Sequence, residues 1–368
     1  MGKAAARPLR KRPPGLWRWH LWAGLGGLLV LLVAAASGTL LVYQKELVAL
    51  VVTPDAQLPA GYGHDSIARE LAQIASSGEP GQALALKAPS ALEPYWTLRH
   101  PEGLELLALG SLEPYRERLW FLRAVELVRE LHVDLFAARW GEMLLLAAAV
   151  LALFLCVSGL LLWWPGRRKF SWRWVLPRRV RLSQLLQYHR HAGALASPLL
   201  ALVLLTGALM LWQKLVRPIL PPPATHTEQQ AAGSGAPGGV AAAYQLARSR
   251  MADGWPTYIR IGTEQGEAQL KVRFRLPGEW HLNGRSSVQV GLRSGDIVVT
   301  ERSDQVGAVR KLVNQLYPLH SGFGMHTVYR LLSLLVGVAL FWLCATGGIH
   351  YLKRLQHRRS RQRLLDAA

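Results

Sequence analysis

The apolar stretch HLWAGLGGLLVLLVAAASG, residues 20–38, contains the pattern on which the whole chain is built. It begins with a histidine, has a glycine four residues later, and ends in a Ser-Gly pair that starts 17 residues after the histidine. The stretch HRHAGALASPLLALVLLTG, residues 189–207, repeats this spacing and ends in Thr-Gly. Both are close to the length of about 20 apolar residues that a helix needs to cross a bilayer.

A second pattern also occurs twice. His132 lies 26 residues before Ser158-Gly159, and His320 lies 26 residues before Thr346-Gly347. Pairs of small residues of this kind let membrane helices pack closely and hydrogen-bond to one another. We therefore predict a mainly α membrane protein with four transmembrane helices, arranged as two parallel repeats. The apolar cores of the four spans are residues 21–42, 143–164, 194–212 and 331–349.

The net charge of +20 is concentrated beside the spans, which argues against nucleic acid as a partner. Six basic residues precede the first span, eight lie between the second and third, and six follow the fourth. Because Lys and Arg accumulate in loops that remain cytoplasmic, we expect both termini and the middle loop inside the cell. The two long segments would be exported, and the basic surface would attract anionic membrane lipid.

Three further features argue against a cleaved signal peptide, a disulfide framework and covalently attached haem. The apolar run of the first span is too long for a typical signal peptide, so we expect it to be retained. Cys156 and Cys344 both lie within spans, where we expect buried thiols and no disulfide framework. The sequence contains no CxxCH motif, which excludes covalent attachment of haem.

The two exported segments have the pattern of small α+β modules. In the first we predict a helix at 65–77 and short strands at 96–98 and 104–109, joined by a hairpin. In the second we predict a linker at 229–239, a helix at 240–251, and strands at 257–261, 269–274, 287–292 and 297–301. Neither segment has a nucleophile–base signature, and we expect surface or structural roles for His64, His100, His226 and His281.

These predictions divide the chain into nine segments. They are a basic tail at 1–20, a span at 21–42, a module at 44–131, a span with a periplasmic extension at 132–164, a basic loop at 165–192, a span at 193–213, a module at 214–319, a span at 320–352 and a basic tail at 353–368.

The four repeated histidines are the strongest candidates for a functional site, because ionisable residues at membrane depth are rare and usually functional. With cytoplasmic termini, His20 and His189 would lie near the inner face, and His132 and His320 near the outer face. Two imidazoles that face each other between helices form a bis-histidine axial site for haem. Zinc would require more ligands. We therefore predict two b-type haems, with anchoring of helix ends in the interface as the alternative role.

Three other histidines lie near the membrane but have no ligand at their repeat-related positions. His191 points to a different helix face from His189. His350 remains an alternative to His20, because it lies at the correct depth. His326 would lie about 9 Å deeper than His320 in a continuous helix, and it is an alternative to His320 if the outer haem lies deeper.

The runs His20-Leu-Trp-Ala-Gly24, His189-Arg-His-Ala-Gly193, Ser158-Gly-Leu-Leu-Leu-Trp-Trp-Pro165 and Tyr317-Pro-Leu-His-Ser-Gly-Phe-Gly324 resemble the PepSY-associated transmembrane family, often called iron-regulated membrane proteins. The resemblance covers nearly the whole chain. It implies PepSY-like periplasmic modules, a bacterial inner-membrane location, and haem-dependent reduction of a periplasmic ferric siderophore.

The resemblance leaves the electron donor open. The expected cytoplasmic parts are too short for a flavin or nicotinamide domain, so the donor would be a quinol or a separate reductase. A non-enzymatic regulator or assembly factor that binds a periplasmic partner is the alternative function. A proton-coupled transporter is disfavoured, because the spans contain almost no acidic residues.

Overall fold

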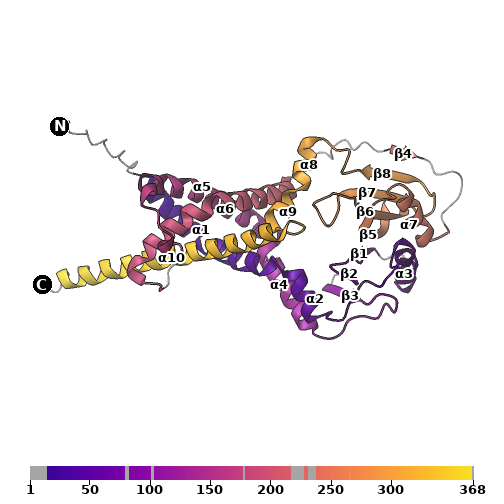
Figure 1. The fold of residues 1–368 in the computed structure, drawn as a ribbon, viewed down its shortest axis with the longest axis horizontal. Coiled ribbons are helices and arrows are strands. Elements are labelled where there is room, and N and C mark those ends of the chain that lie inside the picture. Colours follow the sequence, from indigo (N-terminus) through magenta and orange to yellow (C-terminus); the bar gives the residue numbers. More distant parts are fainter. Residues whose placement is uncertain are drawn as a thin grey trace. The chain divides into compact units, whose positions relative to one another are not determined.

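The computed structural model describes residues 15–78, 83–100, 103–176, 179–216, 228–230, 238–264 and 266–366. The chain divides into two compact units, which are described separately below (Figure 1). The helical unit comprises Met1–Val42, Val128–Pro218 and Leu319–Ala368. The sheet unit comprises Tyr43–Leu127 and Ile219–Pro318.

Four long helices form the helical unit: α1 (Leu16–Leu41), α5 (Ala138–Trp163), α6 (Leu185–Val216) and α10 (Thr327–Asp366). Within the described residues, these are the helices long and apolar enough to cross a membrane, in agreement with the four predicted spans. Helices α1 and α6 each pack against both α5 and α10, so the first and third spans alternate with the second and fourth around the bundle.

Three of these helices extend into segments that we expected to be cytoplasmic tails or loops. Helix α1 begins at Leu16, α6 begins at Leu185, and α10 continues to Asp366. The C-terminal extension follows from its composition, because the residues after Gly348 are mostly good helix formers and include no proline. The loop before α6 contains three 3-10 helices, at Trp164–Lys169, Trp172–Trp174 and Leu182–Gln184.

We expected the second and fourth spans to be continuous helices from their histidine to their Ser/Thr-Gly pair. This prediction was wrong. His132 lies in a separate helix, α4 (Leu119–Asp134), and His320 lies in α9 (Leu316–Ser321). Residues 135–137 separate α4 from α5, and residues 322–326 separate α9 from α10. Both breaks turn through left-handed backbone conformations, at Leu135, Phe136, Ala138, Gly322 and Gly324.

The sheet unit contains one eight-stranded antiparallel sheet in the order β3-β2-β1-β5-β6-β7-β8-β4. Its strands are β1 (Leu84–Lys87), β2 (Trp96–His100), β3 (Gly103–Leu107), β4 (Glu228–Gln230), β5 (Trp255–Glu264), β6 (Glu267–Arg275), β7 (Ser286–Gly291) and β8 (Ile297–Glu301). Strand β1 pairs with β5, with Leu86 opposite Ile259. The prediction of two separate modules was therefore wrong, because the edges of the two meanders pair with each other instead of remaining exposed.

Each of the two chain segments that form this unit nevertheless contributes the same local arrangement, a helix followed by an antiparallel meander. Helix α3 (His64–Ser77) precedes β1, β2 and β3, and α7 (Val240–Ser249) precedes β5, β6, β7 and β8. The two helices pack against each other and against one face of the sheet (Figure 1). That face and the helices share one apolar core, which includes Ile67, Leu71, Leu86, Tyr244, Ile259, Val272 and Val288.

These elements confirm both predicted helices and the six predicted strands. Strands β1 and β4 were missed, and β4 overlaps the start of the predicted linker at 229–239. The tip of the predicted hairpin, residues 101–102, and most of the linker at 229–239 lie outside the described residues. Two more short helices complete the sheet unit, α2 (Gln44–Val51) and α8 (Ala308–Asn314).

His281, in the connection between β6 and β7, is buried, with 2% of its surface exposed. Its ring stacks on Tyr317, with the two centroids 5.2 Å apart. The backbone N–H of Asn283 lies 3.2 Å from Nδ1, and the Arg285 guanidinium lies 2.8 Å from Nε2. Burial, followed by the charge of Arg285, lowers the pKa of His281 from 6.5 to about 3. This histidine is therefore neutral in the folded protein at neutral pH.

The low pKa of His281 predicts that the sheet unit loses stability as the pH falls below 6.5. Over that range the unfolded chain binds a proton that the folded chain does not bind until the pH reaches about 3. At pH 5 the loss from this residue is about 2 kcal/mol. Thermal unfolding of the full chain in detergent at pH 7.5 and pH 5 measures it. His281→Gln is expected to lower the melting temperature at pH 7.5 but to reduce its drop at pH 5; an unchanged drop would contradict the assignment.

Candidate cofactor-binding site

The structure brings the four repeated histidines together in two pairs. The ring centroids of His20 and His189 are 6.3 Å apart, and those of His132 and His320 are 6.1 Å apart. The ring planes are nearly perpendicular in the first pair, at 86°, and lie at 33° in the second. Each pair thus combines one histidine from each half of the chain.

In the first pair, each ring is held through Nδ1 by a neighbouring span. The Nδ1 atom of His189 lies 3.1 Å from the carbonyl oxygen of Leu343 and 3.3 Å from the hydroxyl of Thr346. Because a carbonyl only accepts, Nδ1 of His189 is the donor. The Nδ1 atom of His20 lies 2.8 Å from the hydroxyl of Ser158, which itself donates to the Leu155 carbonyl at 3.4 Å. The Ser158 oxygen therefore accepts from His20.

The second pair is held in the same way. Nδ1 of His132 donates to the carbonyl of Ala34 at 3.1 Å and lies 3.1 Å from the hydroxyl of Ser37. Nδ1 of His320 donates to the carbonyl of Val203 at 2.9 Å. All four neutral rings thus carry their proton on Nδ1, which leaves the lone pair of Nε2 for a metal. Metal-bound histidines usually donate their other ring nitrogen to a carbonyl or a similar acceptor.

The Ser/Thr-Gly pairs of the repeat are the places where the histidine rings meet the helices. A Cβ atom on Gly38 or Gly207 would lie 2.7 Å from the facing ring, closer than real Cβ contacts allow. On Gly159 and Gly347 the same distance would be 3.2 Å and 3.4 Å. These glycines therefore make room for imidazoles, a more specific role than the helix packing expected from the sequence.

The carbonyl acceptors were not identified from the sequence, but they follow a rule. Ala34, Val203 and Leu343 each lie three residues before the serine or threonine of the pair, and four residues before its glycine. In an α-helix, the carbonyl of residue i accepts from the N–H of residue i+4, which here is the glycine. A side chain at the glycine position would lie next to that carbonyl oxygen. The missing side chain leaves the outer side of the carbonyl open to the imidazole.

The two pairs lie toward opposite ends of the same helices. His20 and the Ser37 hydroxyl that contacts His132 are 17 residues apart in α1, which corresponds to about 26 Å along the helix. The hydrocarbon core of a bilayer is about 30 Å thick. Between the pairs, the helices pack through apolar side chains that include Leu31, Ala148, Ala152 and Cys344. The bundle thus holds one pair toward each side of an apolar slab.

The competing histidines near the membrane have other contacts. Nδ1 of His191 accepts from the N–H of Ser171 at 3.4 Å, and its ring lies 5.6 Å from that of Phe170. Nδ1 of His326 accepts from the N–H of Val328 at 3.3 Å, at the start of α10. The structure pairs the ring of His20 with that of His189 and the ring of His320 with that of His132, so His20 and His320 stay the ligands that we predict over His350 and His326.

His357 lies in the C-terminal part of α10, and the other histidines belong to the sheet unit. His64 Nδ1 lies 2.8 Å from the hydroxyl of Tyr244, and His100 lies 3.3 Å from the carboxylate of Glu105. These contacts agree with the structural or surface roles expected of them. His226 lies outside the described residues.

The donor set suits a cofactor that supplies most of its own metal ligands. The described residues contain no group of three or more His, Cys, Asp or Glu side chains that could hold a metal, and Cys156 and Cys344 are buried and free. In haem, the porphyrin leaves two axial positions for the protein. Since a metal–imidazole bond is about 2 Å and the ring centre lies about 1 Å beyond the nitrogen, two axial imidazoles have centroids about 6 Å apart. Both histidine pairs have this spacing.

Comparison with known protein families gives one match over most of the chain. The family model described as the PepSY-associated TM region matches residues 17–354. No curated protein matches the chain. The matched residues include all four paired histidines and all four Ser/Thr-Gly pairs.

The crowding at Gly207 predicts that Gly207→Ala destabilises the helical unit by about 1–3 kcal/mol, because the His320 ring has to move. Gly26→Ala in α1 is the matched control. A Cβ there meets nothing within 4 Å, so this substitution is expected to be neutral or to stabilise by up to about 1 kcal/mol. Thermal unfolding in detergent measures both effects, and equal melting temperatures for the two variants would contradict the role assigned to Gly207.

Proposed function

Since this chain belongs to the family of membrane proteins with a PepSY-associated TM region, we propose that it is a two-haem electron-transfer protein that reduces a periplasmic ferric chelate. The observation that carries the proposal is the arrangement of four histidines in two pairs. Each ring contacts a neighbouring helix through Nδ1, and the ring centroids of the two pairs are 6.3 Å and 6.1 Å apart. Simple anchoring of helix ends does not require this pairing.

In the proposed sites, His20 and His189 would hold one haem, and His132 and His320 the other, in each case through Nε2. A bound haem supplies an iron that accepts and releases one electron at a time. The chain's own residues prepare the ligands: hydroxyls and carbonyls fix the ring tautomer, and glycines provide space for the rings. Without a CxxCH motif the haems would be of the non-covalent b type.

The distribution of charge supports an orientation for this route. Basic residues flank the cytoplasmic ends expected for the spans, so we propose a multi-pass protein of the bacterial inner membrane with both termini in the cytoplasm. The His20–His189 pair would then lie near the cytoplasmic face and the His132–His320 pair near the periplasmic face. The donor would be a quinol or a separate reductase, and the sheet unit would be periplasmic.

The proposed acceptor, a ferric siderophore or similar chelate, rests on the family resemblance and on coordination chemistry. Hard oxygen ligands bind a highly charged cation most strongly, so reduction of ferric to ferrous iron weakens their hold. The alternative, a non-enzymatic regulator or assembly factor, would need no haem. The presence of haem therefore separates the two functions.

The first test is the haem content of protein purified from haem-replete cells. We expect about two haems per chain, with a Soret band that shifts on reduction with dithionite. His132→Ala and His189→Ala should each remove about half of the haem, because each variant breaks one pair. His326→Ala, which alters an exposed histidine outside the pairs, should retain all of it. A colourless wild-type protein, or full haem content in both pair variants, would rule out the proposal.

The second test is electron transfer to the acceptor. Dithionite-reduced protein, freed of excess reductant, is mixed with a ferric chelate, and haem oxidation and ferrous iron are followed together. We expect one ferrous ion for each electron lost. His132→Ala should keep the haem of the first pair but lose most of the oxidation rate, whereas His326→Ala should match the wild type. Oxidation at the wild-type rate in His132→Ala would contradict the proposed route.

A further inference from the structure

The sheet has a second face, which α3 and α7 do not cover. Helices α2 and α4 pack against its β3 edge through an apolar cluster that includes Val48, Leu106 and Leu122, and basic side chains gather on the strands beyond that edge. Side chains alternate between the two faces of a strand, so the neighbours of the buried residues in β1, β5 and β6 project from the other side. Lys87 pairs with Tyr258, and Tyr258 pairs with Arg273, which places these three side chains in one row across the sheet. The Arg273 guanidinium lies over the Tyr258 ring, 5.5 Å from its centroid.

A parallel row lies two residues further along the same strands. Arg99 pairs with Ala85, Ala85 with Arg260, and Arg260 with Lys271. The side chains of Arg99, Arg260 and Lys271 are exposed. In the part of the chain that the structure describes, no carboxylate forms an ion pair with any of these three. We call this surface the cationic face; its members are Lys87, Arg99, Arg260, Lys271 and Arg273.

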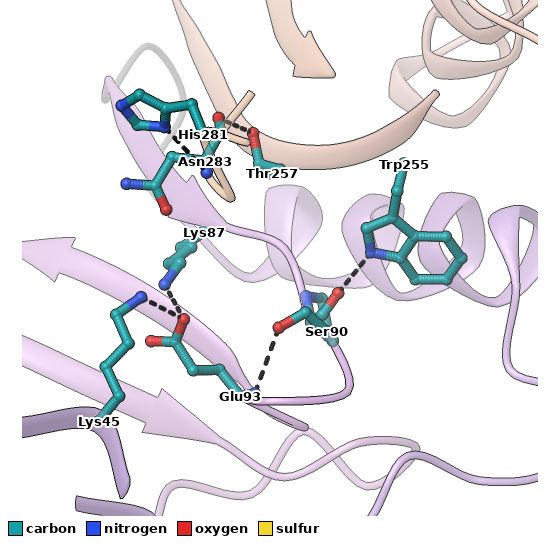
Figure 2. Close-up of polar contacts among 9 residues, drawn as sticks. Lys45, Lys87, Ser90, Glu93, Trp255, Thr257, His281 and Asn283 are labelled. Atoms are coloured by element: carbon teal, nitrogen blue, oxygen red, sulfur yellow. Dashed lines mark hydrogen bonds and ion pairs between the residues drawn. The ribbon is translucent and has the colours of Figure 1, made fainter. Parts of the chain in front are cut away.

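Two of the acids that border the cationic face already have basic partners. Glu93 accepts from Lys45 at 2.6 Å and also from Lys87 (Figure 2). Glu301 pairs with Arg310 at 2.7 Å. Neither carboxylate therefore offsets the charges of Arg99, Arg260 and Lys271.

In the Lys45–Glu93–Lys87 cluster two lysine side chains share one carboxylate, so the cluster has an excess positive charge whenever both lysines are protonated. Burial, followed by the charge of Lys87, lowers the pKa of Lys45 to about 7. Burial alone would raise the pKa of Glu93, but the two lysines outweigh it and lower that pKa. An additional anion beside this cluster would favour the charged form of Lys45.

The loop between β6 and β7 borders the same region of the sheet unit. The hydroxyl of Thr257 donates to the carbonyl of Asn283 at 2.6 Å, which holds this loop against β5. Figure 2 shows Asn283 and His281 beside the Lys45–Glu93–Lys87 cluster. The side chains of Asn283 and Tyr258 add hydrogen-bonding groups to a surface whose charge is supplied by lysine and arginine.

We propose that the cationic face binds a small, multiply anionic, oxygen-rich iron chelate. Adjacent strands are about 5 Å apart, so cations from neighbouring strands are spaced to contact different oxygens of one small molecule. Arginine guanidinium groups suit carboxylate oxygens in particular, because their N–H donors match the carboxylate geometry. The inference rests on the proposed function, which it deepens by specifying the charge and the binding surface of the acceptor.

The test is calorimetric titration of the full chain in phosphatidylcholine nanodiscs with gallium(III) citrate. Gallium(III) replaces iron but is not readily reduced, so binding is measured independently of electron transfer. We expect binding that weakens as salt is added. Arg260→Gln and Lys271→Gln should each weaken binding about two- to fivefold, and the double variant about tenfold. Both side chains are exposed, so these variants are expected to fold.

Arg69→Gln is the matched control, because it removes an exposed arginine from α3, on the other side of the sheet. It should bind gallium(III) citrate as the wild type does. A gallium(III) complex of a linear trihydroxamate that carries a free ammonium group has a net positive charge, and it should bind at least about tenfold more weakly than the citrate complex.

Three results would overturn the inference. They are full affinity in the double variant, equal binding of the cationic gallium complex, and loss of citrate binding in phosphatidylglycerol nanodiscs, which would show that the face binds lipid headgroups.

The outcome of this test is separable from that of the proposed function. If gallium(III) citrate fails to bind while the haem-containing protein still reduces ferric chelates, the binding surface is wrong and the electron-transfer function stands.

Discussion

The structure of the helical unit depends on one constraint, the need to satisfy the N–H group of an imidazole inside an apolar bundle. A polar group in such surroundings is costly unless it is hydrogen-bonded. Most helix carbonyls are unsuitable partners, because they accept within the helix and neighbouring side chains cover them. A glycine at position i+4 uncovers the carbonyl of residue i, and a serine or threonine at i+3 adds a hydroxyl. The uncovered carbonyl accepts from an imidazole in α1, α6 and α10. In α5 the Ser158 hydroxyl takes that place and contacts His20.

The same constraint explains the arrangement of the helices. Each histidine is held by a helix other than its own: His20 by α5, His189 by α10, His132 by α1 and His320 by α6. These contacts link the first and third spans, α1 and α6, to the second and fourth spans with the helices that precede them. They agree with the packing of α1 and α6 against α5 and α10. The breaks after α4 and α9 belong to the same design, because they free His132 and His320 from the continuous helices expected from the sequence.

Much of this unit could be predicted because its signals are local and repeated. Four apolar runs predict four helices, and equal spacings in the two halves predict which histidines pair. The break at 135–137 could not be predicted, since Leu135 and Phe136 adopt left-handed conformations that no sequence signal announces. The second break had a signal in Gly322 and Gly324, both with positive φ. The pairing of β1 with β5 was missed because β1 has only four residues and its partner lies in the other half of the chain.

The sheet unit shows that the distribution of charge can be more informative than its sum. Taken together, residues 44–131 and 214–319 carry nearly equal numbers of basic and acidic residues, so their net charge gives no indication of an anion-binding surface. The register of the strands determines which face of the sheet each of these residues occupies. It aligns Arg99, Ala85, Arg260 and Lys271 across the strands on one face, while Glu93 and Glu301 are held in ion pairs at its borders. A nearly neutral unit thereby acquires a surface whose local field is strongly positive, and it is this local field that attracts and orients a charged ligand.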